Sequence, residues 1–314
     1  MEMARGMKVW CRALRVLPWL LLGWLASCGG GTTQIQPFVP QRVIYIGDET
    51  VGLLPDGTRY GINVLSASGV FDCAQFAIWT QQIALAFGFT TDFCGGGAFG
   101  VTRATPGAQA ADIEGQISAQ IAASGVSPKD LFIVMVGMND IIDLYENFVG
   151  DRTCETGNNN PPPGSLMSEL RARGSFVAGQ VNRLINANGR LIVSTVHDLG
   201  YTPYALARNG STLLSCMTAV FNARVRVDPI QDGRFWGLVL ADDDTIAAVN
   251  SPSSFGVNNT TAAACTVAPP NCTTSTLVIP EATSFLWATD RVFGPLFHNQ
   301  LANQAITRAR NNPF

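Results

Sequence analysis

Three polar segments place reactive side chains after or beside apolar runs. Gly-Asp-Glu-Thr at 47–50 follows a β-branched run, Gly-Met-Asn-Asp at 137–140 follows a continuous apolar run, and Asp290 and His298 lie near the C-terminus. A hydroxyl with a nearby base can act as a nucleophile, and N–H donors can stabilise the oxyanion of a tetrahedral intermediate. These residue types fit acyl transfer, provided that the fold brings them together.

The apolar patterns predict the elements that must position these segments. Continuous apolar runs of strand length alternate with helical patterns, which predicts one α/β domain whose parallel sheet lies between layers of helices. Ligands of such open sheets bind at the carboxyl ends of the strands, where the polar segments fall. The expected strands are 42–46, 131–136, 191–196 and 235–240, and the expected helices are 74–87, 110–123, 165–188, 213–225, 241–249 and 296–310.

The N-terminal segment resembles an export signal. A basic start precedes an apolar run at 16–26, which is too short to cross a hydrocarbon core of about 30 Å as a helix. The run ends Leu-Ala-Ser-Cys, similar to a bacterial lipobox, so residues 1–27 are predicted to be a lipoprotein signal peptide and Cys28 the lipid-carrying N-terminus. The alternative is an ordinary signal peptide with Cys28 as a simple thiol.

This interpretation places the protein in the bacterial cell envelope, held to the outer membrane through the lipid on Cys28. A Gly-rich tether at 28–40 would then lead to a single domain at 41–314. In an oxidising compartment the six later cysteines predict up to three disulfides. The favoured local pair is Cys265–Cys272, followed by Cys73–Cys94, and the complete connectivity stays open.

Composition excludes several classes of protein. With 47% hydrophobic and 14% charged residues the chain is not disordered, and a net charge of -3 argues against a nucleic-acid partner. The 2 histidines exclude a His-rich metal site, and neither a phosphate loop nor a dinucleotide motif is present, so no metal or cofactor is expected. The acidic run at 242–244 is interpreted as capping a helix and compensating its dipole, not as a calcium site.

Taken in order, the polar segments resemble the conserved blocks of the GDSL/SGNH family of ester hydrolases over residues 42–310. The resemblance implies a three-layer α/β/α sandwich with a flavodoxin-like parallel sheet, and a small-molecule or lipid ester as substrate. It also implies an oxyanion hole formed by the Gly107 backbone N–H and the Asn139 side chain, with Gly47 and Asp48 supporting the first block. The matching segments are 45–48, 105–108, 137–140, 196–203, 251–265 and 286–290.

Two positions depart from the family pattern. Glu49 stands where the family has its nucleophilic serine, and Phe293 stands where the last block has its histidine. Asp290 and the two oxyanion donors remain. The ordinary Ser-His-Asp mechanism is therefore untenable for this chain.

Three interpretations stay open. The first is a working esterase with a displaced dyad, in which Thr50 is the nucleophile and His298 the base, with His197 as an outside candidate for the base. The second is a hydrolase in which the carboxylates of Glu49 and Asp290 divide the acid and base roles. The third is a binding protein on a retired hydrolase fold, whose pocket holds an ester, an acyl group or a glycan.

Overall fold

The computed structural model describes residues 37–94, 99–311 and 314. The predicted signal peptide, Cys28 and most of the predicted tether lie outside the described residues and stay predictions. Within the described part of the chain, no helix combines the length and the apolar character needed to cross a membrane.

A five-stranded parallel sheet forms the centre of the domain. Its strand order is β2-β1-β3-β4-β5, the order of flavodoxin-like sheets, so the predicted α/β fold class is confirmed. In the centre of the sheet Val134 pairs with both Ile46 and Val193. The strands are β1 (Arg42–Gly47), β2 (Gly100–Thr102), β3 (Asp130–Met135), β4 (Arg190–Ser194) and β5 (Trp236–Val239).

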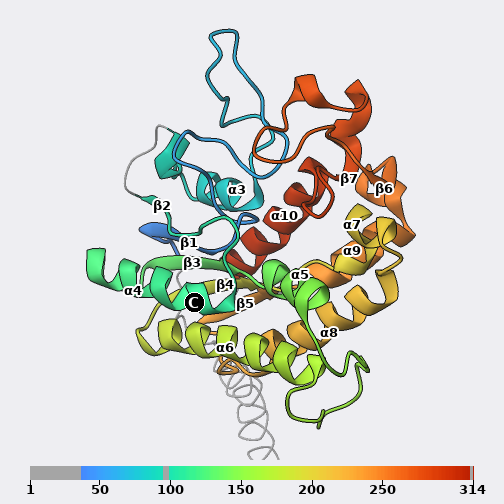
Figure 1. Ribbon diagram of the computed structural model, residues 1–314. Coiled ribbons are helices and arrows are strands. Elements are labelled where there is room, and N and C mark those ends of the chain that lie inside the picture. The colour runs from blue at the N-terminus through green and yellow to red at the C-terminus, as the bar shows by residue number, and fades with distance from the viewer. Residues whose placement is uncertain (1–36, 95–98, 312–313) are drawn as a thin grey trace, which may run out of the picture. The chain divides into compact units, whose positions relative to one another are not determined.

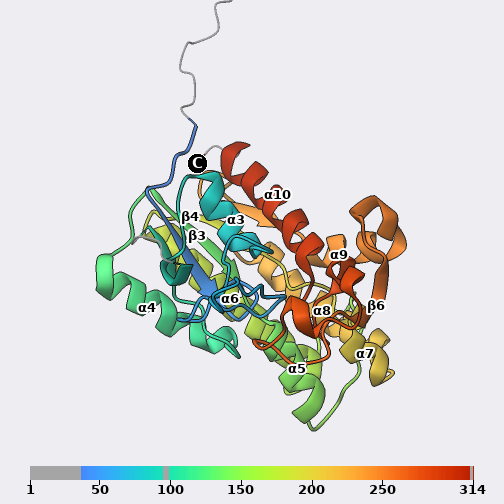
Figure 2. The same ribbon diagram turned by 90° about the horizontal axis from the view of Figure 1, so that it is seen from above.

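Helices cover both faces of this sheet (Figure 1). On β1, Ile44 and Ile46 belong to one apolar cluster and Val43 and Tyr45 to another, because successive side chains of a strand point to opposite faces. The first cluster includes side chains of α4 (Ile113–Ser124), α5 (Met138–Asn147), α6 (Leu166–Asn186), α7 (Pro203–Ala207) and α8 (Ser211–Val227). The second includes side chains of α3 (Trp79–Ala86), α9 (Ala241–Asn250) and α10 (Pro295–Asn311). Figure 2 shows α3 beside α10 over the strands.

Some elements differ from the predicted ones for identifiable reasons. The helix expected at 74–87 begins only at Trp79, because Phe76 adopts a positive φ of 50° that a helix does not allow. The long helix ends at Asn186 because Asn188, with φ 67°, turns the chain before Gly189. The short strand β2, the helices α5 and α7, and a separate parallel pair were not predicted; that pair is β6 (Asn259–Ala263) and β7 (Phe285–Trp287).

Three disulfides join the six cysteines of the domain. Cys265–Cys272 and Cys73–Cys94 confirm the two favoured pairs, and Cys154–Cys216 completes the set. This last bond ties the irregular stretch after α5 to α8. Disulfides of this number are typical of proteins that fold outside the cytoplasm.

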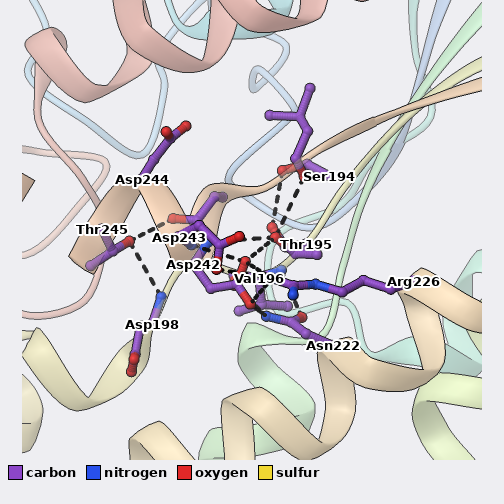
Figure 3. A network of polar contacts seen from close by, with 12 residues as sticks. Ser194, Thr195, Val196, Asp198, Asn222, Arg226, Asp242, Asp243, Asp244 and Thr245 are labelled. Carbon is purple, nitrogen blue, oxygen red and sulfur yellow. Dashed lines mark hydrogen bonds and ion pairs between the residues drawn. The ribbon is translucent and has the colours of Figure 1, made fainter. Parts of the chain in front are cut away.

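A buried polar network closes the edge of the sheet where β4 and β5 end (Figure 3). Asp242, in the first turn of α9, accepts hydrogen bonds from Thr195 Oγ1 at 2.7 Å, Asn222 Nδ2 at 2.9 Å and Arg226 Nη2 at 2.7 Å. Asn222 in turn donates to the carbonyl of Val196 at 2.7 Å. The network joins α8 and α9 to the strand ends, and the described residues contain no group of three or more metal-ligating side chains.

Asp242→Ala is expected to destabilise the protein by about 3 kcal/mol, because it leaves two buried donors and a guanidinium without their acceptor. Urea unfolding followed by circular dichroism measures the loss. The matched control is Asp243→Ala, whose side chain is 54% exposed and pairs with Arg226 at 3.2 Å. An equal cost for both variants would contradict the assigned role of the network.

Candidate functional site

The two predicted oxyanion donors converge on one oxygen atom, and that atom belongs to the chain itself. Glu49 Oε2 accepts a hydrogen bond from the backbone N–H of Gly107 at 2.8 Å and another from Asn139 Nδ2 at 3.0 Å. Glu49 follows β1 and is half-buried. The two donors that were predicted to stabilise an oxyanion therefore both bind a carboxylate side chain of the chain itself.

The loops that carry the donors are fixed by contacts around them. Asn139 lies in the first turn of α5, and its amide also donates to the carbonyl of Ala108 at 3.2 Å. The next residue, Asp140, accepts from the backbone N–H of Ala110 at 2.8 Å and pairs with Arg173. Burial raises the pKa of Asp140 to about 6. The 137–140 segment thus holds the 105–110 turn against the end of β1.

Gly47 takes its place at the end of β1 because a side chain would collide there. A Cβ at this position would lie 1.9 Å from the carbonyl oxygen of Met135, and φ is +140°. Gln116 on α4 clamps both backbone groups of Gly47, with its Oε1 at 2.8 Å from the N–H and its Nε2 at 2.9 Å from the carbonyl oxygen. Gln116 was not predicted as a site residue. No sequence signal singled it out, because the predicted helix also contains the polar residues Glu114 and Gln120.

The Thr50 hydroxyl is used inside the first-block turn. Its Oγ1 donates to Asp48 Oδ1 at 2.5 Å, its backbone N–H donates to the same oxygen at 2.9 Å, and the residue is 1% exposed. Asp48 is also buried, and burial, followed by the charge of Glu49, raises its pKa well above the usual range. Asp48 and Thr50 therefore form a buried turn that directs the Glu49 side chain toward Gly107 and Asn139.

Both histidines are buried beside Phe293. His298 Nδ1 accepts from the Trp79 N–H at 3.3 Å, and its ring lies 4.4 Å from that of Phe293. His197 Nε2 donates to the Arg291 carbonyl at 2.8 Å, and its ring lies 5.2 Å from Phe293. Burial lowers the pKa of His197 to about 4 and that of His298 to about 3.

The Thr50 hydroxyl and the His298 ring are used in different contacts. The hydroxyl donates to Asp48, the ring accepts from the backbone N–H of Trp79, and no hydrogen bond joins the hydroxyl to the ring among the described residues. His298 is 3% exposed, so it packs in the core and not on a helix surface. The geometry does not favour the displaced dyad.

A pocket of about 480 Å³ opens beside Glu49. Asp290, whose side chain is 51% exposed, lies in its wall with Arg291, and the two side chains are 3.4 Å apart. The structure thus brings Glu49, Asn139 and Asp290 to one pocket. Tyr60, Arg291 and the segment around the Cys265–Cys272 disulfide also line it. The start of that segment falls within the family-like stretch 251–265, but none of these residues had been predicted as a site residue.

His298→Gln is expected to reduce the loss of unfolding free energy that occurs as the pH falls below 7. In the fold the pKa of His298 is lowered by burial, and then by the charge of Arg59, to about 3, against about 6.5 in an unfolded chain. The unfolded chain takes up the proton first. His298 therefore contributes stability that is complete above pH of about 6.5 and is lost as the pH falls toward about 3, by up to about tenfold in the unfolding constant per pH unit.

The measurement is the difference in unfolding free energy between wild type and His298→Gln, from pH 7 to pH 4. The glutamine amide oxygen can still accept from the Trp79 N–H, and the raised pKa values of buried carboxylates such as Asp140 cancel in the difference. We expect the advantage of the wild type to shrink as the pH falls. A difference that is constant with pH would show that His298 is not held neutral.

Comparison with known proteins gives matches of overall structure only. No protein-family model and no curated protein matches the chain. It is similar to the crystal structure of a member of the lipolytic G-D-S-L family from Veillonella parvula, with 9% identity, a TM-score of 0.44, and coverage of 84% of this chain and 96% of that one. It is also similar to Axe2, an acetylxylan esterase from Geobacillus stearothermophilus, with 15% identity, a TM-score of 0.40, and coverage of 87% and 96%.

Proposed function

We propose that this chain is a ligand-binding protein of the bacterial cell envelope, built on a GDSL/SGNH-type hydrolase scaffold that no longer cleaves esters. One observation carries the proposal: Glu49 Oε2 occupies both oxyanion donors, the Gly107 N–H and the Asn139 amide. An ester carbonyl can be activated there only if the carboxylate leaves, because Oε2 occupies the place where the Gly107 N–H and the Asn139 amide converge.

The other residues that were considered for catalysis, Thr50, His197 and His298, are also buried in contacts with their neighbours. The Thr50 hydroxyl is buried, donates to Asp48 and not to a histidine, and Thr50 is not among the residues that line the pocket, so it is not presented to a substrate. The imidazoles of His197 and His298 are buried and neutral on either side of Phe293. A hydroxyl, a base and an open oxyanion hole are each needed for serine-type acyl transfer, and none is free in this site.

The pocket itself favours binding. Its volume of about 480 Å³ lies within the range of about 300–1,000 Å³ that small-molecule sites occupy, and it combines apolar walls with a few polar groups. The three disulfides support export. Lipid attachment at Cys28 and anchoring to the outer membrane belong to the same proposal and rest on the lipobox-like segment.

The test is an ester screen with p-nitrophenyl acetate, butyrate and palmitate on wild type, Glu49→Gln, Thr50→Ala, His298→Ala and Asp290→Asn. We expect no turnover above the buffer rate for any of them. Wild-type turnover that disappears in Thr50→Ala and His298→Ala would establish the displaced dyad instead. Turnover that disappears in Glu49→Gln and Asp290→Asn would establish the carboxylate pair.

A further inference from the structure

We infer that Glu49 is a built-in analogue of an acylated serine, and that its pocket binds a neutral, hydroxyl-rich ligand. The inference rests on the proposed binding function. In an O-acetylserine the carbonyl carbon lies two bonds beyond Cβ, and Glu49 places its carboxylate carbon at the same distance. The carbonyl oxygen of the acyl group corresponds to Oε2, which lies in the oxyanion hole.

The second carboxylate oxygen defines what the pocket offers to a ligand. Glu49 Oε1 accepts no hydrogen bond from the described part of the chain, and Glu49 lines the pocket. In an acyl-enzyme the position of Oε1 belongs to the alkyl substituent of the acyl group. A ligand hydroxyl can donate to Oε1 from the pocket, because Gly107 and Asn139 hold Oε2 and leave Oε1 as an acceptor.

The charges around the pocket select against acidic ligands. Glu49 and Asp290 both line it, and the single guanidinium, that of Arg291, lies 3.4 Å from Asp290. The pocket is thus lined by two carboxyl groups and one guanidinium, an arrangement that disfavours a carboxylate or phosphate ligand. Burial, followed by the charge of Glu49, raises the pKa of Tyr60, so its phenol stays protonated and can donate to a ligand oxygen.

The walls of the pocket match a ligand with hydroxyls and an apolar skeleton. Val267, Ala268 and Pro269 provide apolar surface, and the ring of Tyr60 lies on the same pocket. Hydroxyl groups both donate and accept, so one ligand can use the acceptor Glu49 Oε1 and the donor Arg291 together. An ammonium ligand would be attracted by the carboxylates, but it cannot accept a hydrogen bond from Arg291 or Tyr60, so it would use only the acceptors of the pocket.

The binding test uses saturation-transfer NMR on the mature, full-length domain with sorbitol, ethylammonium and acetate as probes. We expect sorbitol to bind the wild type. In Glu49→Gln the amide oxygen must face the two donors of the hole, so an NH2 group replaces Oε1 and the sorbitol signal should fall at least about fivefold. Glu281→Gln, the same chemical change at an exposed glutamate outside the pocket, is the matched control and should bind as the wild type does.

A second measurement tests the acyl-serine analogy itself. Glu49→Ala empties the hole, so added acetate should raise the melting temperature of this variant by about 2–4 °C and leave those of the wild type and of Glu49→Ala/Asn139→Ala unchanged. Equal acetate effects on all three proteins would overturn the analogy. Binding of ethylammonium or acetate in place of sorbitol, or no binding of any probe, would overturn the proposed ligand class. The proposed function would still stand in that case, as long as no ester is cleaved. Ester turnover would instead overturn the proposed function.

Discussion

Gly137→Ala is expected to cost more than about 3 kcal/mol of stability and to leave little folded protein. A Cβ at this position would lie 2.4 Å from two ring atoms of Phe221 on α8, and 2.9 Å from Val196. The backbone at Gly137 has φ +128°, a conformation that side chains rarely adopt. The buried ring of Phe221 cannot move without opening the contact between α8 and the sheet, so the structure cannot relax the clash at low cost in free energy.

The effect is measured by soluble yield and urea unfolding, with Gly179→Ala as the control. Gly179 is exposed on α6, and an added Cβ there meets no atom within 4 Å outside its own helix. Alanine in a helix is favoured over glycine by about 1 kcal/mol, so the control should be neutral or slightly stabilised. If Gly137→Ala were as stable as Gly179→Ala, Gly137 at the start of α5 would not be packed tightly against Phe221.

Removal of the Cys154–Cys216 bond, as Cys154→Ala/Cys216→Ala, is expected to cost about 4 kcal/mol. The bond closes a loop with a sequence separation of 62 residues, and closing a long loop removes more conformational freedom from the unfolded chain than closing a short one. It also fixes the stretch after α5 to α8, next to the helix that presents Asn139.

The matched comparison is Cys265→Ala/Cys272→Ala, whose sequence separation is 7 and whose expected cost is about 2 kcal/mol. Guanidinium unfolding of both variants and of wild type gives the two costs. The order should be Cys154–Cys216 above Cys265–Cys272. The reverse order would mean that local packing, and not loop closure, sets the contribution of these bonds.

The sheet was predictable because of how its strands are buried. Strands covered on both faces carry continuous apolar runs, and 131–136 therefore predicted β3 to within one residue at each end. The edge strand β2 has only three residues and no such run. Helix α5 escaped prediction because its first turn contains Asn139 and Asp140, polar residues that read as a site motif and not as the start of a helix.

The site was predictable as a set of donors but not as an occupied site. The motifs indicated that Gly107 and Asn139 would meet, and they do meet on a common acceptor. That the acceptor is Glu49 depends on contacts across sequence separations of 58 and 90 residues. The wall formed by Tyr60 and the 263–269 segment likewise depends on tertiary packing, which no local pattern encodes.

The filled oxyanion hole has a consequence for how this scaffold persists. In a working hydrolase such donors have no acceptor within the protein, and these unpaired groups lower the free energy of unfolding. In this chain the hydrogen bonds from Gly107 and Asn139 to Glu49 pair them, so that cost is absent. Under the proposed binding function these donors therefore contribute to the stability of the native state without any catalytic role. Selection for stability alone would then be enough to keep Gly107, Asn139 and Glu49 together.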